Sequence, residues 1–181
     1  DKNGNVTNEF RESDKVMTGK TYDAPWMGGF GTSFRWKGLQ LSAQFSWIGT
    51  RYVINNDRYF EEGGVTFGTA YNQSRRVLYN RWKNPGDITD IPKWGEVNQL
   101  DDRYLENASF LRLKNLSLSY SLPQAWLSKT KFFTLVRIYA QAQNLFTITG
   151  FNGLDPEVSS NVYQAQYPAS RQFTLGMEVS F

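Results

Sequence analysis

The sequence predicts an all-β fold, an antiparallel transmembrane β-barrel segment of about five strands with long extracellular loops. Three observations predict it. Apolar and polar residues alternate with a period of two in several segments of the chain. The strands, at about 9–14 residues, are long enough to cross the hydrocarbon layer when tilted. Short and long connections alternate along the chain, as they do in outer-membrane barrels.

The first two predicted strands form a hairpin. Residues 30–36 and 39–47 both alternate, and Lys37-Gly38 between them is typical of a tight turn. The apolar faces carry Phe30, Thr32, Phe34 and Trp36, then Leu39, Leu41, Ala43, Phe45 and Trp47.

The next two strands are predicted over residues 110–122 and 132–146. Leu111 and Leu113 lie on the opposite parity from Leu116 and the apolar residues that follow it, which predicts a bulge near Lys114-Asn115. Residues 123–131 form a short turn with one helical turn around residues 125–127. The last strand covers residues 172–181.

Two long connections, residues 51–109 and 147–171, join these strands and are rich in Asn, Asp, Gly and aromatic residues. A short amphipathic helix is predicted from Tyr71 to Trp82, and residues 84–87, Asn-Pro-Gly-Asp, end it.

Composition excludes several classes of function. The chain has 181 residues, a net charge of +3, no Cys and no His. It therefore has no disulfide, no thiolate metal site and no imidazole for acid/base chemistry. A weak net charge without a basic face gives no indication of nucleic-acid binding. Adjacent acids such as Glu61 and Glu62 point in opposite directions in an extended chain, so we expect no enzyme.

The two faces of the strands favour a barrel wall. The polar residues would face a hydrated lumen; the lumen-facing candidates are Gln40, Gln44, Arg137, Tyr139, Gln141 and Gln143. Aromatic residues near the strand ends suit the two membrane interfaces. Five strands cannot close a barrel, so we expect the chain to pair with further strands. A soluble all-β carbohydrate-binding module, in which aromatic residues line one groove, remains the alternative.

Several motifs together resemble the SusC/RagA-type TonB-dependent outer-membrane transporters of Bacteroidetes. The main ones are YLENASFLRLKNLSLSY at residues 104–120, QNLF at 143–146 and GLDPEV at 153–158. The resemblance covers nearly the whole chain, because four further segments fit the same pattern. They are the opening Asp1-x-Asn3-Gly4, the Gly28–Gly31 segment, Tyr167-Pro168 and residues 171–181.

The resemblance implies that residues 1–181 are the C-terminal part of a 22-stranded barrel in a Gram-negative outer membrane. It also implies that the plug and the TonB box belong to the rest of the same transporter. Such proteins import oligosaccharides or oligopeptides with a SusD-like surface lipoprotein as a lid, and TonB supplies the energy. Outer-membrane lipid would surround the barrel.

Two groups of residues are candidates for function. Aromatic residues of the first long loop could contact the solute or the lid: Tyr59, Phe60, Tyr71, Tyr79, Trp82 and Trp94. The terminal strand resembles the signal read by the outer-membrane assembly machinery, with Phe173, Leu175, Met177, Val179 and Phe181 on one face.

We expect no cofactor and no metal. Oxygen-bearing residues near the start of the chain have the spacing of a calcium loop, but Val6 stands where such a loop needs Gly. These residues are Asp1, Asn3, Asn5, Glu9 and Glu12.

Overall fold

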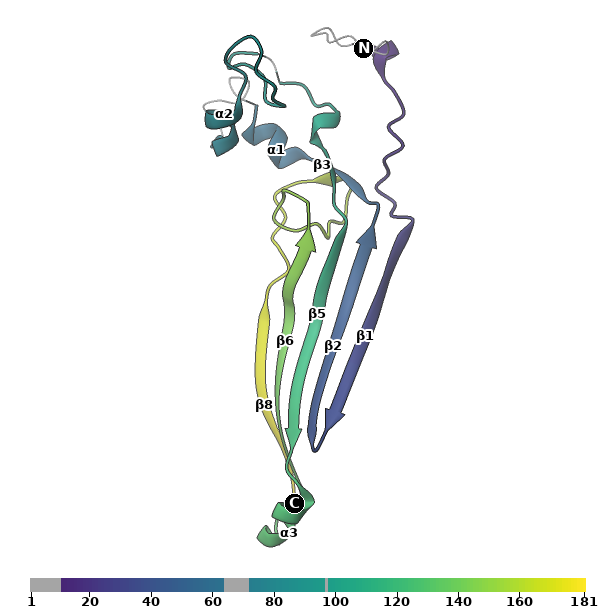
Figure 1. Cartoon of the computed structure of the whole chain (residues 1–181), viewed down its shortest axis with the longest axis vertical. Coiled ribbons are helices and arrows are strands. Elements are labelled where there is room, and N and C mark those ends of the chain that lie inside the picture. Colours follow the sequence, from purple (N-terminus) through teal and green to yellow (C-terminus); the bar gives the residue numbers. More distant parts are fainter. Residues whose placement is uncertain (1–10, 64–71, 97) are drawn as a thin grey trace.

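A computed structural model describes residues 11–63, 72–96 and 98–181. Its body is a five-stranded antiparallel sheet in the order β1-β2-β5-β6-β8. The strands are β1 (Trp26–Trp36), β2 (Leu39–Gly49), β5 (Phe110–Ser121), β6 (Leu135–Thr149) and β8 (Gln172–Ser180). The two long connections gather at one end of the sheet, and the β5–β6 connection and the C-terminus lie at the other (Figure 1).

The register aligns residues of like polarity across all five strands. One row joins Phe34, Leu41, Leu118, Ala140 and Leu175. The next row, on the opposite face, consists of Ser33, Ser42, Ser117, Gln141 and Thr174. The sheet therefore has one apolar and one polar face, as the alternation predicts.

The bulge predicted near Lys114-Asn115 is confirmed. Phe45 pairs with Leu113 and Gln44 with Asn115, so Lys114 is an extra residue in β5. In the neighbouring pair, Leu113 faces Phe146 and Asn115 faces Gln143. The insertion moves the apolar residues of β5 from odd to even positions while keeping them on one face.

The β1–β2 hairpin turns at Lys37-Gly38, as predicted. Both residues have positive φ angles, 45° and 88°, which is the backbone of a two-residue turn that suits the twist of the strands. A Cβ atom at Gly38 would lie 2.5 Å from the carbonyl oxygen of Ser121, so this position requires glycine.

The β5–β6 connection contains helix α3 (Gln124–Thr130), longer than the single turn that was predicted. The expected start of the following strand at Phe132 is wrong, because β6 begins at Leu135. The amides of Phe132 and Phe133 donate to the Thr130 hydroxyl, so both residues still belong to the turn. The strand continues past 146 to Thr149, since Thr149 pairs with Phe110.

The long loops contain their own short elements. These are β3 (Tyr52–Asn55), β4 (Leu105–Asn107), β7 (Val162–Tyr163), α1 (Asn56–Glu61), α2 (Arg75–Asn80) and the 3-10 helix η3 (Asp102–Tyr104), while a further 3-10 helix, η1 (Glu12–Asp14), precedes β1. The strands form a second sheet in the order β4-β3-β7. Across the described ranges, no helix is long and apolar enough to span a bilayer.

The helix predicted over Tyr71–Trp82 is shorter than expected. α2 begins after Ser74, whose hydroxyl accepts from the amide of Arg76, and it ends at Asn80. Beyond the helix, the amide of Trp82 donates to the carbonyl of Ile91 at 3.0 Å. Trp82 is therefore bonded across the loop and does not extend the helix.

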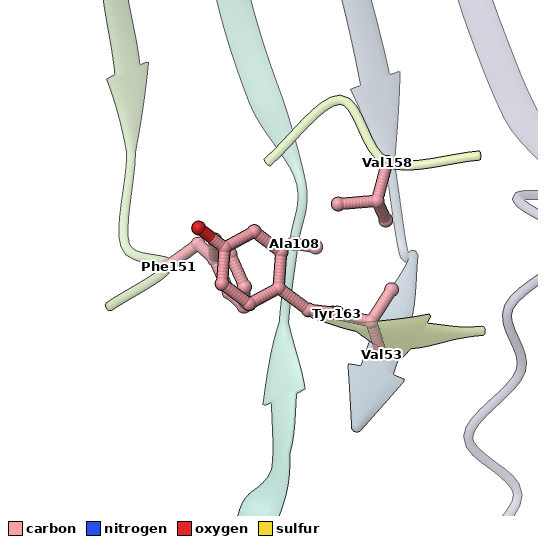
Figure 2. Packing of buried hydrophobic residues seen from close by; sticks show 5 residues of the cluster. All are labelled: Val53, Ala108, Phe151, Val158 and Tyr163. Atoms are coloured by element: carbon pink, nitrogen blue, oxygen red, sulfur yellow. The ribbon is translucent and has the colours of Figure 1, made fainter. Parts of the chain in front are cut away.

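A small core fixes the loops to the end of the main sheet (Figure 2). The rings of Phe151 and Tyr163 meet edge to face, with centroids 5.1 Å apart. The other members, Val53, Ala108 and Val158, are also buried. Because these residues come from both long connections, the core joins the connections into one layer, which we call the loop layer (residues 50–109 and 150–171).

Candidate functional site

The six residues predicted to face the lumen lie on the polar face of the sheet. Gln40 and Tyr139 each pair with Ser119 of β5, and Gln44 and Gln143 each pair with Asn115. Gln141 donates to the side chain of Asn115 at 3.0 Å, and Arg137 donates to Ser119 at 3.1 Å. Two of the six side chains thus bond to polar side chains of β5, and the lumen-facing role of all six stays a prediction.

The aromatic candidates of the loop layer divide into packed and exposed residues. Tyr59 packs edge to face on buried Tyr104, with ring centroids 5.5 Å apart, and it also contacts Phe60. Tyr79 and Trp94 are exposed, and the guanidiniums of Arg75 and Arg81 lie over their rings. Trp82 is half-buried, and Tyr71 lies outside the described residues.

A hollow of about 600 Å³ opens beside α1. Its lining combines the Phe60 ring with side-chain amides and carboxylates, from Asn56, Asp57, Glu61, Asn72 and Gln164. Burial raises the pKa of Glu61, and the nearby carboxylates of Asp57 and Glu62 raise it further. The hollow therefore offers hydrogen-bond acceptors and negative charge to a solute.

Arg58 of α1 joins three parts of the loop layer. Its guanidinium donates to Glu62 at 3.0 Å, to Glu106 at 3.0 Å and also to Asp90. Arg76 of α2 shares two of these partners, Glu62 at 2.5 Å and Asp90 at 2.8 Å. The two helices and β4 are thus connected by a network of alternating charges.

The network shifts the ionisation of its members. Burial alone would lower the pKa of Arg58, but the carboxylates of Glu62 and Glu106 raise it well above its usual range. Burial alone would raise the pKa of Asp90, yet Arg76 and Arg58 hold it below its usual range. Arg58 and Asp90 are consequently both charged at neutral pH.

A second ionic cluster fixes the loop that follows β6 to the strands beneath it. Arg112 of β5, 2% exposed, donates to Asp155 at 2.5 Å, to Glu157 at 2.8 Å and to the Thr147 hydroxyl at 2.9 Å. Lys114, the bulge residue, also pairs with Glu157 at 2.8 Å. We call these four charged residues the clasp.

Neighbouring contacts strengthen the attachment. The Asp155 carboxylate also accepts from the backbone amides of Glu157 and Ala169, each at 2.9 Å. Burial would raise the pKa of Asp155, but these amides and Arg112 lower it. Arg51, between β2 and β3, donates to the carbonyl of Val158 at 2.6 Å, so the loop after β6 is also bonded to the first long connection.

Comparisons with known proteins support this architecture. The chain is 29% identical to TonB-dependent receptor P3 of Formosa agariphila and 30% identical to TonB-dependent receptor SusC of Bacteroides thetaiotaomicron, and both alignments cover all of it. A solved structure of the RagAB peptide importer matches 97% of the chain with a TM-score of 0.86 and 40% identity. The chain belongs to the SusC/RagA type of TonB-dependent receptors. No family model matches it.

This SusC/RagA-type chain spans less than a fifth of the length of these curated relatives: 18% of receptor P3 and 17% of SusC. It also spans 19% of the RagAB chain. Family membership places the chain in an outer membrane, as predicted. Because these relatives are receptors or importers, they favour a receptor segment over a soluble carbohydrate-binding module.

The terminal strand of this receptor segment has the predicted alternation. Its apolar residues pair with the apolar positions of β6, for example Leu175 with Ala140 and Met177 with Ile138. Phe173, Val179 and Phe181 complete the same face, and Phe181 follows directly after β8. The role of this strand as an assembly signal stays a prediction.

Metal binding has little support in the sequence, and the described residues add no candidate site. Glu12 pairs with Lys15 at 2.7 Å, and Asp1, Asn3, Asn5 and Glu9 lie outside the described residues. Among the side chains that the structure describes, no three acidic residues gather to hold an ion.

Sequence reasoning missed the two ionic clusters of the receptor segment. One signal was available: Arg112 lies between Leu111 and Leu113 in a strand, and a charge at such a position requires a partner. The partner residue could not be identified, because Asp155 lies 43 residues away in an irregular loop. Arg58 offered no signal, since its partners come from three different segments.

Proposed function

We propose that this chain forms part of the barrel wall and of the outer loop layer of a TonB-dependent importer of oligosaccharides or oligopeptides. The observation that carries the proposal is the register, which gives five long strands one apolar and one polar face. The likeness to the RagAB peptide importer over 97% of the chain supports it. The chain has no catalytic role in this proposal.

The proposed importer has further parts. The remaining strands, the plug and the TonB box would lie on the rest of the receptor, and TonB would supply the energy there. A SusD-like lipoprotein would cover the loop layer, where exposed Tyr79 and Trp94 offer contact area for it. The polar face would line the route of the solute.

Oligopeptides are the favoured solute. The chain is 40–41% identical to the RagAB peptide importer, compared with 30% for SusC. The hollow beside α1 adds a chemical reason, since Asp57 and Glu61 can accept hydrogen bonds from the amines and amides of a peptide.

Uptake by cells tests the proposed function. The full-length receptor is expressed with its lipoprotein in a strain that lacks both, and uptake of labelled oligopeptides and oligosaccharides is measured. We expect oligopeptide uptake that disappears when the TonB box is deleted. Uptake of oligosaccharides alone would reject the favoured solute, and uptake that survives the deletion would reject the TonB-dependent mechanism.

The hollow is tested by substitution. We expect Glu61→Gln to weaken peptide binding about tenfold, because a hydrogen bond to a charged group contributes about 1.5–3 kcal/mol, and Phe60→Ala to weaken it through the loss of apolar contact. Ile88→Ala, at a fully exposed position of the same loop layer, is the matched control. Equal affinity for all three variants would show that the solute binds elsewhere.

A further inference from the structure

The β5–β6 connection places an amphipathic turn at the end of the sheet opposite to the loop layer (Figure 1). Leu127 of α3 is 2% exposed, so it fixes the helix to the strands. Trp126, its neighbour in the sequence, is 60% exposed. A large exposed aromatic on a short helix requires an explanation, since water is a poor environment for its ring.

Two phenylalanines continue the apolar face of the sheet as far as this turn. Val179 pairs with Val136, and Phe181 lies two residues further along the same face. The ring of Phe181 lies 5.4 Å from that of Phe132, which in turn contacts Phe133. Phe132 and Phe181 are 62% and 78% exposed, so the apolar face ends in an uncovered aromatic cluster.

Positive charge borders this cluster. Residues 121–134, SLPQAWLSKTKFFT, contain two lysines and no acidic residue. Lys129 and Lys131 are both exposed, and no acidic side chain of the described ranges forms an ion pair with either. Aromatic rings with lysines just beyond an apolar surface match the chemistry of a bilayer interface, where rings lie among the headgroups and lysines reach the phosphates.

We propose that the α3 turn is an anchor that binds phospholipid headgroups of the leaflet at this end of the sheet. Trp126 and Phe132 lie at the level of the headgroups, and Lys129 and Lys131 contact lipid phosphate. The continuity of the cluster with the lipid-facing side of the strands supports a lipid occupant over a protein one. The proposal rests on the membrane location of the sheet and is independent of the solute.

Quenching of a fluorescent label tests the location. The chain has no cysteine, so Trp126→Cys and Phe132→Cys each give one labelling site in this segment. The full-length receptor, with any other cysteines replaced by Ser, is labelled with bimane and placed in nanodiscs. The matched control is Ile88→Cys in the loop layer, which is fully exposed.

We expect a lipid with a nitroxide headgroup to quench the labels at 126 and 132 at least twofold more than the label at 88. Iodide in the water should show the opposite order. If iodide quenches the label at 126 as strongly as the label at 88, the turn lies in water. If neither quencher reaches it, a protein segment covers the turn. Either result would overturn the proposal.

The lysines have a test of their own. Native mass spectrometry counts the anionic phospholipids retained by the full-length receptor. We expect Lys129→Gln with Lys131→Gln to weaken retention about fivefold for each lysine removed. Lys93→Gln, at an exposed position of the loop layer, should leave retention unchanged. Equal retention in all variants would contradict the phosphate contact. A shift in gel mobility on boiling verifies that each variant is folded.

Discussion

Arg112 shows how one residue can join segments that are far apart in the sequence. It lies on the polar face of β5, between Ser46 of β2 and Thr147 of β6. Removing a guanidinium from water is costly, and the carboxylates of Asp155 and Glu157 compensate for much of that cost. The folded loop and the buried charge therefore depend on each other.

Replacing Arg112 should release this loop. We expect Arg112→Met to weaken docking of residues 150–163 by about 3 kcal/mol, because it leaves Asp155 without its counter-charge. Hydrogen exchange of the loop amides in the detergent-solubilised receptor measures the change. Arg137→Met is the control, since its partner Glu178 is 3.8 Å away and half exposed, and such pairs contribute about 0–1 kcal/mol. Equal loss of protection in both variants would refute the role of the clasp.

Acid should release the same loop. Backbone amides and Arg112 lower the pKa of Asp155 below the unfolded value of about 3.9. The carboxylate therefore stabilises the docked loop at neutral pH, and this stability is lost as the pH falls through the lowered folded pKa. A spin label at Leu154→Cys, which is exposed, should stay immobile until the pH is below about 4. Mobility that rises already between pH 6 and 5 would contradict this assignment.

The strands β6 and β8 fit together through one glycine. Gly176 pairs with Tyr139, and a Cβ atom at position 176 would overlap the tyrosine ring. The ring thus occupies the space left by the missing side chain, which compensates for the weak strand preference of glycine. A pattern of alternation alone could not show this, because it places Gly176 simply on the polar face.

A double-mutant cycle tests this contact. We expect Gly176→Ala to destabilise the β6–β8 pair by about 1–3 kcal/mol through overpacking, and Tyr139→Ala to destabilise it less. In the combined variant the clash is gone, so the two changes should cost less together than their sum. The measurement is the temperature at which the unboiled receptor changes its gel mobility. Additive effects would indicate that the ring moves aside freely.

At the scale of the whole molecule, the aromatic ends of the strands predict how the sheet tilts in the membrane. Trp36 of β1 lies in the same row as Met177 of β8, while Phe181 lies four residues further on. If both aromatics mark one interface, that interface shifts by about 13 Å along the strand direction across four strand spacings of about 4.8 Å. The strands are then tilted by about 35° from the membrane normal. This value falls in the range of outer-membrane barrels.

Depth measurements check the tilt. Spin labels at Trp36→Cys and Met177→Cys should differ in membrane depth by about 11 Å although they share a row, because the row itself is inclined. A label at Phe132→Cys, whose native ring touches Phe181, should lie at about the depth of the label at 36. Equal depths for positions 36 and 177 would mean that the strands stand upright.

Most of the main sheet could be predicted from the sequence, because strand patterning is local. The hairpin at Lys37-Gly38 and the bulge at Lys114 both follow from the parity of neighbouring apolar residues. The start of β6 was predicted too early, since Phe132 has the same parity as Val136 and Ile138, although Thr130 holds its amide in a turn. Alternation reports polarity and carries no information on such side-chain to backbone bonds.

The two faces of the sheet and the resemblance to outer-membrane receptors can be recognised from the residue pattern, since both depend on residues close together in the chain. How the loop layer is held can be seen only in the folded chain. Arg58 meets Glu106 across 48 residues, and Arg112 meets Asp155 across 43. The two partners of such an ion pair are not separated by any regular spacing in the sequence. Which charges become partners depends on which segments the folded sheet and its small core bring together.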